Sequence, residues 1–238
     1  MEKIINYENL RNFAYCNDHL IKGEVKGIVL EFCGFNTVTF HSSDNASGRE
    51  YASKGIIYVI PYYNPWCFMN RATVKYTDEI VEVLVNKYNL GKNAKIVSTG
   101  LSMGALGALV YSVYAKITPC ACVANSPVCD LVYHYENRPG VARALYGSFY
   151  EYDCDWYSAL RSSSPLHLID KMPNIPYTIF HCECDATLDI EKHSTRLVNA
   201  MKDKFSVNYI KVPFRENCDL SGEAKVEYEK AILKAFEE

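Results

Sequence analysis

The chain has 238 residues, of which 49% are hydrophobic and 22% are charged, and its formal net charge at pH 7 is -3. Acidic and basic residues are interspersed without a basic stripe, so the sequence argues against nucleic acid as a partner. No apolar run reaches the roughly 20 residues of a membrane span, and the polar segment 1–18 lacks a signal-peptide pattern, so we expect a cytoplasmic protein with no membrane contact.

Short apolar segments alternate with amphipathic ones along the chain. Thr77 is expected to cap one helix and Gly91 to end it. The expected strands span 26–35, 55–63, 95–100, 120–126, 175–182 and 206–214, and the expected helices span 77–91, 103–117, 188–202 and 222–236. This alternation predicts the α/β class, with a mostly parallel central sheet and helices on both of its faces.

The segment 130–163 interrupts the alternation, because it is long and rich in tyrosine, phenylalanine and tryptophan. We expect it to form helices that make a small cap within a single domain spanning 1–238. The alternative is ordinary helix packing at the edge of the sheet.

The strongest local motif is Gly100-Leu101-Ser102-Met103-Gly104, which follows an expected strand and opens an expected helix. A sharp strand-to-helix turn of this kind lifts a serine above the sheet as a nucleophile. A Cβ at either flanking glycine would collide with the neighbouring backbone. The motif therefore predicts acyl-transfer chemistry at Ser102.

This motif and the segment SPLHLIDKMPNIPYTIFHCECD, from Ser164 to Asp185, resemble the α/β-hydrolase superfamily. Within it, the chain is most similar to the prolyl-oligopeptidase-like and dienelactone-hydrolase-like serine esterases and peptidases. The resemblance covers nearly the whole chain from Lys26. It implies the α/β-hydrolase fold and a catalytic triad in the order serine, acid, histidine. The acid carries over to Asp185, with Asp130 after the preceding strand as the alternative.

The resemblance also implies an oxyanion hole formed by two backbone amides. One is that of Met103, directly after the nucleophile, and the other is that of Phe35, in the loop after the first expected strand. Polar and aromatic residues after the second expected strand are candidates for substrate binding, namely Tyr63, Asn64 and Trp66.

The expected catalytic histidine is missing, because Asn217 stands where the family places it and no histidine follows His193. An amide does not accept a proton near neutral pH, so the general-base role is empty. Three explanations remain open: an engineered replacement, a natural relative that only binds, or another histidine acting as base. The candidates for that histidine are His193, whose simpler interpretation is a surface or rim side chain, and His134 in the expected cap.

These features together predict a serine hydrolase scaffold that cleaves carboxylic esters through an acyl-enzyme on Ser102 and is impaired by Asn217. Two alternatives are a non-catalytic binding protein on the same fold and a peptidase acting on small acylated peptides. The expected partner is a small ester or a short peptide. We expect no cofactor and no metal, and the ten cysteines are interpreted as reduced side chains. The oligomeric state stays open.

Overall fold

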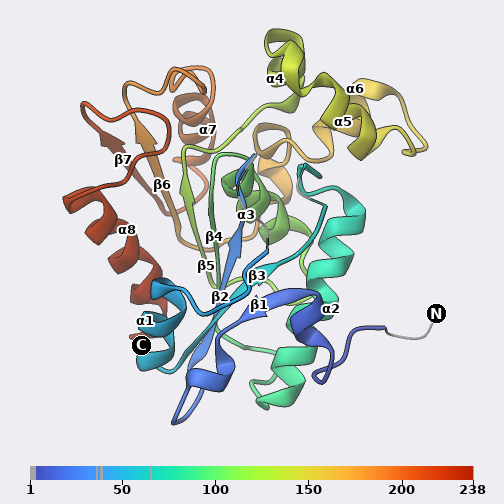
Figure 1. The fold of residues 1–238 in the computed structure, drawn as a ribbon. Coiled ribbons are helices and arrows are strands. Elements are labelled where there is room, and N and C mark those ends of the chain that lie inside the picture. The colour runs from blue at the N-terminus through green and yellow to red at the C-terminus, as the bar shows by residue number, and fades with distance from the viewer. Residues whose placement is uncertain (1–3, 36, 38–39, 65, 238) are drawn as a thin grey trace.

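A seven-stranded sheet forms the centre of the computed structural model, which describes residues 4–35, 37, 40–64 and 66–237 (Figure 1). The strand order is β1-β3-β2-β4-β5-β6-β7, and only β1 runs antiparallel to its neighbour. The strands are β1 (Ala14–Cys16), β2 (Gly27–Phe32), β3 (Ile56–Pro61), β4 (Ile96–Leu101), β5 (Ala121–Asn125), β6 (Tyr177–Cys182) and β7 (Val207–Val212). The α/β class and the mostly parallel sheet are therefore confirmed.

Helices cover both faces of this sheet, as the sequence predicted (Figure 1). Along β2, Ile28 and Leu30 belong to one buried cluster, whereas Val29 belongs to the cluster on the opposite face. The first cluster packs under α2 (Arg71–Lys87), α3 (Met103–Tyr114) and α7 (Ser194–Met201), and the second under α1 (Ala46–Ser53) and α8 (Glu223–Leu233). The alternation of side chains along each strand thus builds one core on each face.

The aromatic segment after β5 forms α4 (Leu131–Asn137), α5 (Ala142–Phe149) and α6 (Trp156–Arg161). These helices lie together beyond one end of the sheet, at the top right of Figure 1. Their aromatic rings hold them to one another, because Trp156 lies 5.3 Å from Tyr135 and 6.3 Å from Tyr146 between ring centroids. In the described part of the chain, no helix is both long and apolar enough to cross a bilayer.

The helix expected from Thr77 starts earlier than predicted. It begins at Arg71, because the side chain of Asn70 accepts a hydrogen bond from the Thr73 amide at 3.0 Å and caps the helix. Thr77 is fully buried inside the helix, so its assignment as the cap was wrong. The helix ends at Lys87, so Gly91 lies beyond its end.

The helix expected from Leu188 also starts at a different residue, Ser194. The preceding residues form a turn in which Asp189 Oδ1 accepts hydrogen bonds from the amides of Glu191 and Lys192. Neither β1 nor α1 was predicted from the sequence. Strand β1 has three residues, which is too short for a hydrophobic period to show.

The two edges of the sheet differ in their exposure. All three residues of β1 are buried, whereas β7 carries the exposed side chains of Asn208 and Lys211. The backbone of β7 pairs with β6 along its whole length on one side. The outer side of β7 is thus the open edge of the described sheet.

Candidate active site

Ser102 lies at the junction of β4 and α3, in a backbone conformation that L-residues rarely adopt (φ 54°, ψ -118°). Its amide donates a hydrogen bond to the Asn125 carbonyl of β5 at 2.9 Å, and its carbonyl accepts from the Leu106 amide at 3.1 Å. The sheet and the helix therefore hold the serine from both sides. Strain of this kind persists only where the surrounding structure fixes it, and it is frequent at reactive residues.

The two glycines of the motif make this turn possible. A Cβ on Gly104 would lie 2.0 Å from the Phe32 carbonyl oxygen, and one on Gly100 would lie 2.6 Å from the backbone carbon of Gly104. Both distances are far below any normal contact. Strand β2, the turn and α3 consequently approach as closely as their backbones allow.

Asp185 follows β6 with its side chain almost fully buried, at 1% exposure. Its Oδ1 accepts hydrogen bonds from the amides of Thr187 and Leu188 at 2.8 and 2.9 Å. Its Oδ2 lies 3.9 Å from Nε2 of His181 and 4.0 Å from the sulfur of Cys218. One carboxylate oxygen thus fixes the turn, and the other faces the loop after β7.

That loop presents two neighbouring side chains to the Asp185 turn. Asn217 is exposed, and its Oδ1 accepts a hydrogen bond from the Thr187 hydroxyl at 3.0 Å. Cys218 is partly buried, and its sulfur faces Asp185 Oδ2. Both residues have positive φ, and the Cys218 carbonyl accepts from the Asn125 side chain at 2.9 Å.

Cys218 is the residue of this group that the sequence reasoning missed. Burial and then the Asp185 carboxylate raise the pKa of its thiol to about 12, against smaller opposing contributions from the Ser126 hydroxyl and the Ser102 amide. The thiol is therefore protonated at neutral pH. Cys218 was missed because the family's order of motifs places the catalytic histidine at Asn217, one residue earlier.

Neither candidate histidine lies at the surface. His193 is 2% exposed and His134 is 5% exposed, so the interpretation of His193 as a rim side chain was wrong. Nδ1 of His193 accepts a hydrogen bond from the Cys129 amide at 3.2 Å, and the two imidazole rings lie 5.9 Å apart. Burial, followed by the other nearby imidazoles, lowers the pKa of His193 to about 4 and that of His134 to about 3.

His181 packs beneath Asp185 and is held by two structural partners. Its Nδ1 lies 2.6 Å from the Ser194 hydroxyl, and its Nε2 lies 3.0 Å from the Leu188 carbonyl. Burial lowers its pKa. These contacts account for both ring nitrogens.

The alternative acid, Asp130, caps α4 instead of facing the serine turn. Its Oδ1 accepts hydrogen bonds from the amides of Val132 and Tyr133, and its Oδ2 accepts one from Arg196 at 3.1 Å. Within the described residues, no group of three or more histidine, cysteine, aspartate or glutamate side chains is arranged to hold a metal ion.

The remaining predicted site residues divide into a buried pair and an aromatic surface. Met103 opens α3 and is buried. Tyr63 is also buried, and its hydroxyl accepts a hydrogen bond from the Cys33 amide at 2.9 Å, so it supports the loop that carries Phe35. The ring of Phe35 lies 5.6 Å from that of Trp66, which is 38% exposed.

The α5 helix is connected to this aromatic surface. The hydroxyl of Ser148 donates a hydrogen bond to the Trp66 carbonyl at 2.7 Å. Asn64 is exposed beside Trp66 and accepts a hydrogen bond from its amide at 3.4 Å. Phe35 and α5 thus both contact Trp66, the first through its ring and the second through a hydrogen bond.

No protein-family model and no curated protein matches the sequence. Solved structures do match it. A mutant of puromycin hydrolase superposes with a TM-score of 0.74 at 17% identity, over 90% of this chain and 35% of that one. The acylaminoacyl peptidase of Pyrococcus horikoshii gives 0.68 at 13% identity, over 90% and 37%. Esterase 2 of Thermogutta terrifontis gives 0.65 at 15% identity, over 93% and 86%.

The chain spans about a third of the length of the puromycin hydrolase and the peptidase, and most of the length of the esterase. At these identities the likeness concerns the fold. The chain has the α/β-hydrolase fold, which it shares with these esterases and peptidases.

Proposed function

We propose that the chain is a serine hydrolase scaffold for carboxylic esters, with Ser102 as nucleophile and Asp185 as the orienting acid. The observation that carries the proposal is the strained backbone of Ser102 at the strand–helix junction, with φ 54° and ψ -118°. Its place at the carboxyl end of a central parallel strand is where ligands bind in open α/β sheets.

The proposed reaction is acyl transfer. Ser102 Oγ attacks the ester carbonyl, and the oxyanion accepts hydrogen bonds from the amides of Met103 and Phe35. The C–O bond to the alcohol breaks, and the proton that Ser102 loses ends on the departing alkoxide. Water then hydrolyses the acyl-enzyme, which releases the carboxylate and restores the Ser102 hydroxyl. The N-terminal end of α3 adds a positive potential near the oxyanion.

The step without support is removal of the Ser102 proton. In this proposal the loop after β7 holds the base position, at Asn217 by the family's order of motifs or at Cys218 by its contact with Asp185, and the amide of Asn217 does not accept the proton. The neighbouring Cys218 thiol, with its pKa raised to about 12, does not accept it either. In serine hydrolases, loss of the catalytic histidine lowers turnover by on the order of a million-fold. The rest of the site still gives a rate roughly a thousand-fold above that in water.

The proposed substrate is a small ester whose apolar part packs on the surface formed by Phe35 and Trp66, next to the exposed Asn64. The Ser148–Trp66 hydrogen bond joins α5 to this surface. We therefore interpret the segment 130–163 as a cap over the site within a single domain.

Two other functions have specific support. A non-catalytic binding protein is favoured by the burial and lowered pKa of His193 and His134, which leave no accessible imidazole among them to act as base. A peptidase acting on small acylated peptides is favoured by the structural likeness to the acylaminoacyl peptidase.

The test is hydrolysis of p-nitrophenyl butyrate by the unaltered chain and by two histidine variants, Asn217→His and Cys218→His. Cys218→His places an imidazole opposite Asp185 Oδ2, so we expect it to raise kcat by several orders of magnitude, whereas Asn217→His, at an exposed side chain, is expected to raise it less. The reverse order would keep the base position at Asn217. Adding Ser102→Ala to the more active variant must abolish the gain.

A fluorophosphonate probe distinguishes the enzyme scaffold from the binding protein. The repaired variant is expected to be labelled at Ser102, and its Ser102→Ala partner is expected to remain unlabelled. If neither histidine variant reacts with the ester or the probe, the binding-protein function replaces the hydrolase proposal.

A further inference from the structure

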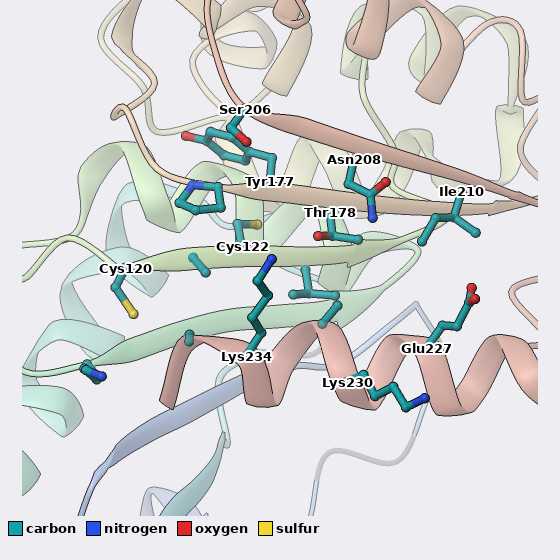
Figure 2. Close-up of a pocket in the computed structure, with 16 residues that line it drawn as sticks. Cys120, Cys122, Tyr177, Thr178, Ser206, Asn208, Ile210, Glu227, Lys230 and Lys234 are labelled. Carbon is teal, nitrogen blue, oxygen red and sulfur yellow. The ribbon is translucent and has the colours of Figure 1, made fainter. Parts of the chain in front are cut away.

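A cavity of about 910 Å³ lies between α8 and the strands β5, β6 and β7 (Figure 2). It is lined by Ala121 and Val123 near the start of β5 and by Tyr177 at the start of β6. Ser102 lies instead beyond the carboxyl end of β4. The cavity is thus at the opposite end of the sheet from the proposed reaction and is separate from it.

The charged side chains around this cavity are mostly cationic. Lys95, Lys230 and Lys234 line it, and among the described residues Glu227 is the single acidic member of the lining. Lys234 follows α8 and extends towards the strands, whereas Lys230 points away from them (Figure 2). Within the described residues, neither Lys230 nor Lys234 forms an ion pair. An ammonium group that faces a cavity without an acidic partner favours an anionic ligand.

The surface beneath Lys234 is mainly apolar. Val123 and Ile210 contribute from the strands, and Ala231 contributes from α8. Thr178 and Asn208 add polar groups that point into the same space from β6 and β7 (Figure 2). The cavity therefore combines an apolar floor, two hydrogen-bonding side chains and one inward-pointing cation at Lys234, with the Glu227 carboxylate near Ile210, away from Lys234 (Figure 2).

We propose that this cavity binds a medium-chain fatty-acid anion, with the carboxylate at Lys234 and the alkyl chain along the floor of Val123, Ile210 and Ala231. The volume is within the range of small-molecule sites. No arginine lines the cavity to bind a phosphate in bidentate fashion, so a single carboxylate is the better match for the lysine. The proposal does not depend on any reaction at Ser102.

The test is isothermal titration calorimetry with decanoate below its micellar concentration. We expect saturable binding to the unaltered chain and at least tenfold weaker binding to Lys234→Glu, because the ion pair becomes a repulsion. Lys225→Glu is the matched control: it makes the same charge change on an exposed position of α8 that does not line the cavity, and its affinity is expected to stay within about twofold. Ala231→Trp fills the floor and is expected to abolish binding while Lys234 remains.

Two further ligands and the Ser102→Ala variant test whether decanoate binds in this cavity and not near Ser102. Decan-1-ol and decyltrimethylammonium are expected to bind at least tenfold more weakly than decanoate, and Ser102→Ala is expected to bind decanoate normally. Absence of decanoate binding, equal binding by Lys234→Glu, or equal binding of the alcohol would overturn the proposal. Loss of binding in Ser102→Ala would place the ligand in the catalytic cleft instead. A dimer that Lys234→Glu converts to a monomer would assign the cavity to a subunit interface.

Discussion

The sulfur of Cys218 lies 4.0 Å from Oδ2 of Asp185, at the limit of a hydrogen bond from a thiol to a carboxylate. The other carboxylate oxygen, Oδ1, accepts hydrogen bonds from the backbone amides of Thr187 and Leu188. The thiol is thus the polar group of the β7 loop that faces the remaining carboxylate oxygen. Burial and, after it, the negative charge of Asp185 raise the pKa of the thiol and keep the proton on sulfur.

The reactivity of the cysteines follows from their exposure. Cys154 and Cys184 are exposed, while Cys120 and Cys218 are partly buried with raised pKa values. We expect two fast reactions with 5,5′-dithiobis(2-nitrobenzoic acid) at pH 8 in the folded chain, and ten after denaturation in guanidinium. The double variant Cys154→Ser/Cys184→Ser should lose the fast phase. A third fast thiol that disappears in Cys218→Ser would contradict the protonated state of Cys218.

Substitution of Gly104 is expected to be severe. Gly104→Ala places a Cβ 2.0 Å from the Phe32 carbonyl oxygen, so β2 and α3 must separate. The free energy of unfolding should fall by about 3 kcal/mol or more, measured by urea denaturation. Gly147→Ala is the control, since it lies in α5 with no atom within 4 Å of the added carbon. It should raise stability by up to about 1 kcal/mol, and equal losses in both variants would refute the close approach at Gly104.

The backbone strain at Ser102 is measurable as stability. Ser102→Gly removes the Cβ that makes φ 54° unfavourable, whereas Ser102→Ala keeps it. We expect the glycine variant to be more stable than the alanine variant by about 1–3 kcal/mol in urea. Because both lack the hydroxyl, the difference isolates the backbone. Equal stability of the two variants would show that the turn stores no strain.

Acid should destabilise the fold through its buried imidazoles, chiefly those of His134 and His193, and His181 acts in the same direction because burial lowers its pKa too. Their pKa values in the folded state, about 3 for His134 and about 4 for His193, lie below the unfolded value of roughly 6.5. The unfolded chain therefore binds more protons between these values, and stability falls as the pH drops from about 6.5 towards 4. The imidazoles of His134 and His193 each contribute on the order of 3 kcal/mol to this loss.

Replacing one imidazole tests this dependence. His134 Nδ1 is buried and has no hydrogen-bond partner in the described part of the chain, so His134→Phe should keep its stability at pH 7 and lose less of it at pH 5. Urea midpoints at the two pH values measure the effect. An unaltered slope in His134→Phe would show that this imidazole titrates normally.

The sheet and its covering helices could be predicted from the sequence because apolar residues form runs or recur at helical spacing, as in β4 and α3. The turn at Ser102 could be predicted because the close backbone contacts around it admit only glycine at positions 100 and 104, and both glycines are visible in the motif. The start of α2 was missed because the capping signal of Asn70 lies before the apolar period begins. Strand β1 was missed because three residues show no period.

The sequence did not predict which side chain of the loop after β7 faces Asp185. Residue order placed Asn217 beside Asp185, and the structure brings its side chain to Thr187 in that turn. Positive φ at both Asn217 and Cys218 decides which side chain faces inward, and no pattern in the residues reports a backbone angle. The burial of His193 likewise depends on α4 packing over it, through the contacts of its ring with Tyr133 and His134.

The unequal edges of the sheet limit how copies of this chain can associate through backbone pairing. Both edge strands have a strand partner on one side only, but β1 is buried and β7 is partly exposed, so β7 is the edge of the described sheet with accessible peptide groups. A molecule with a single such edge can join one other across a twofold axis, and the joined edges are then used up. Growth into a filament needs two edges per molecule. Sheet extension by this fold therefore stops at a pair.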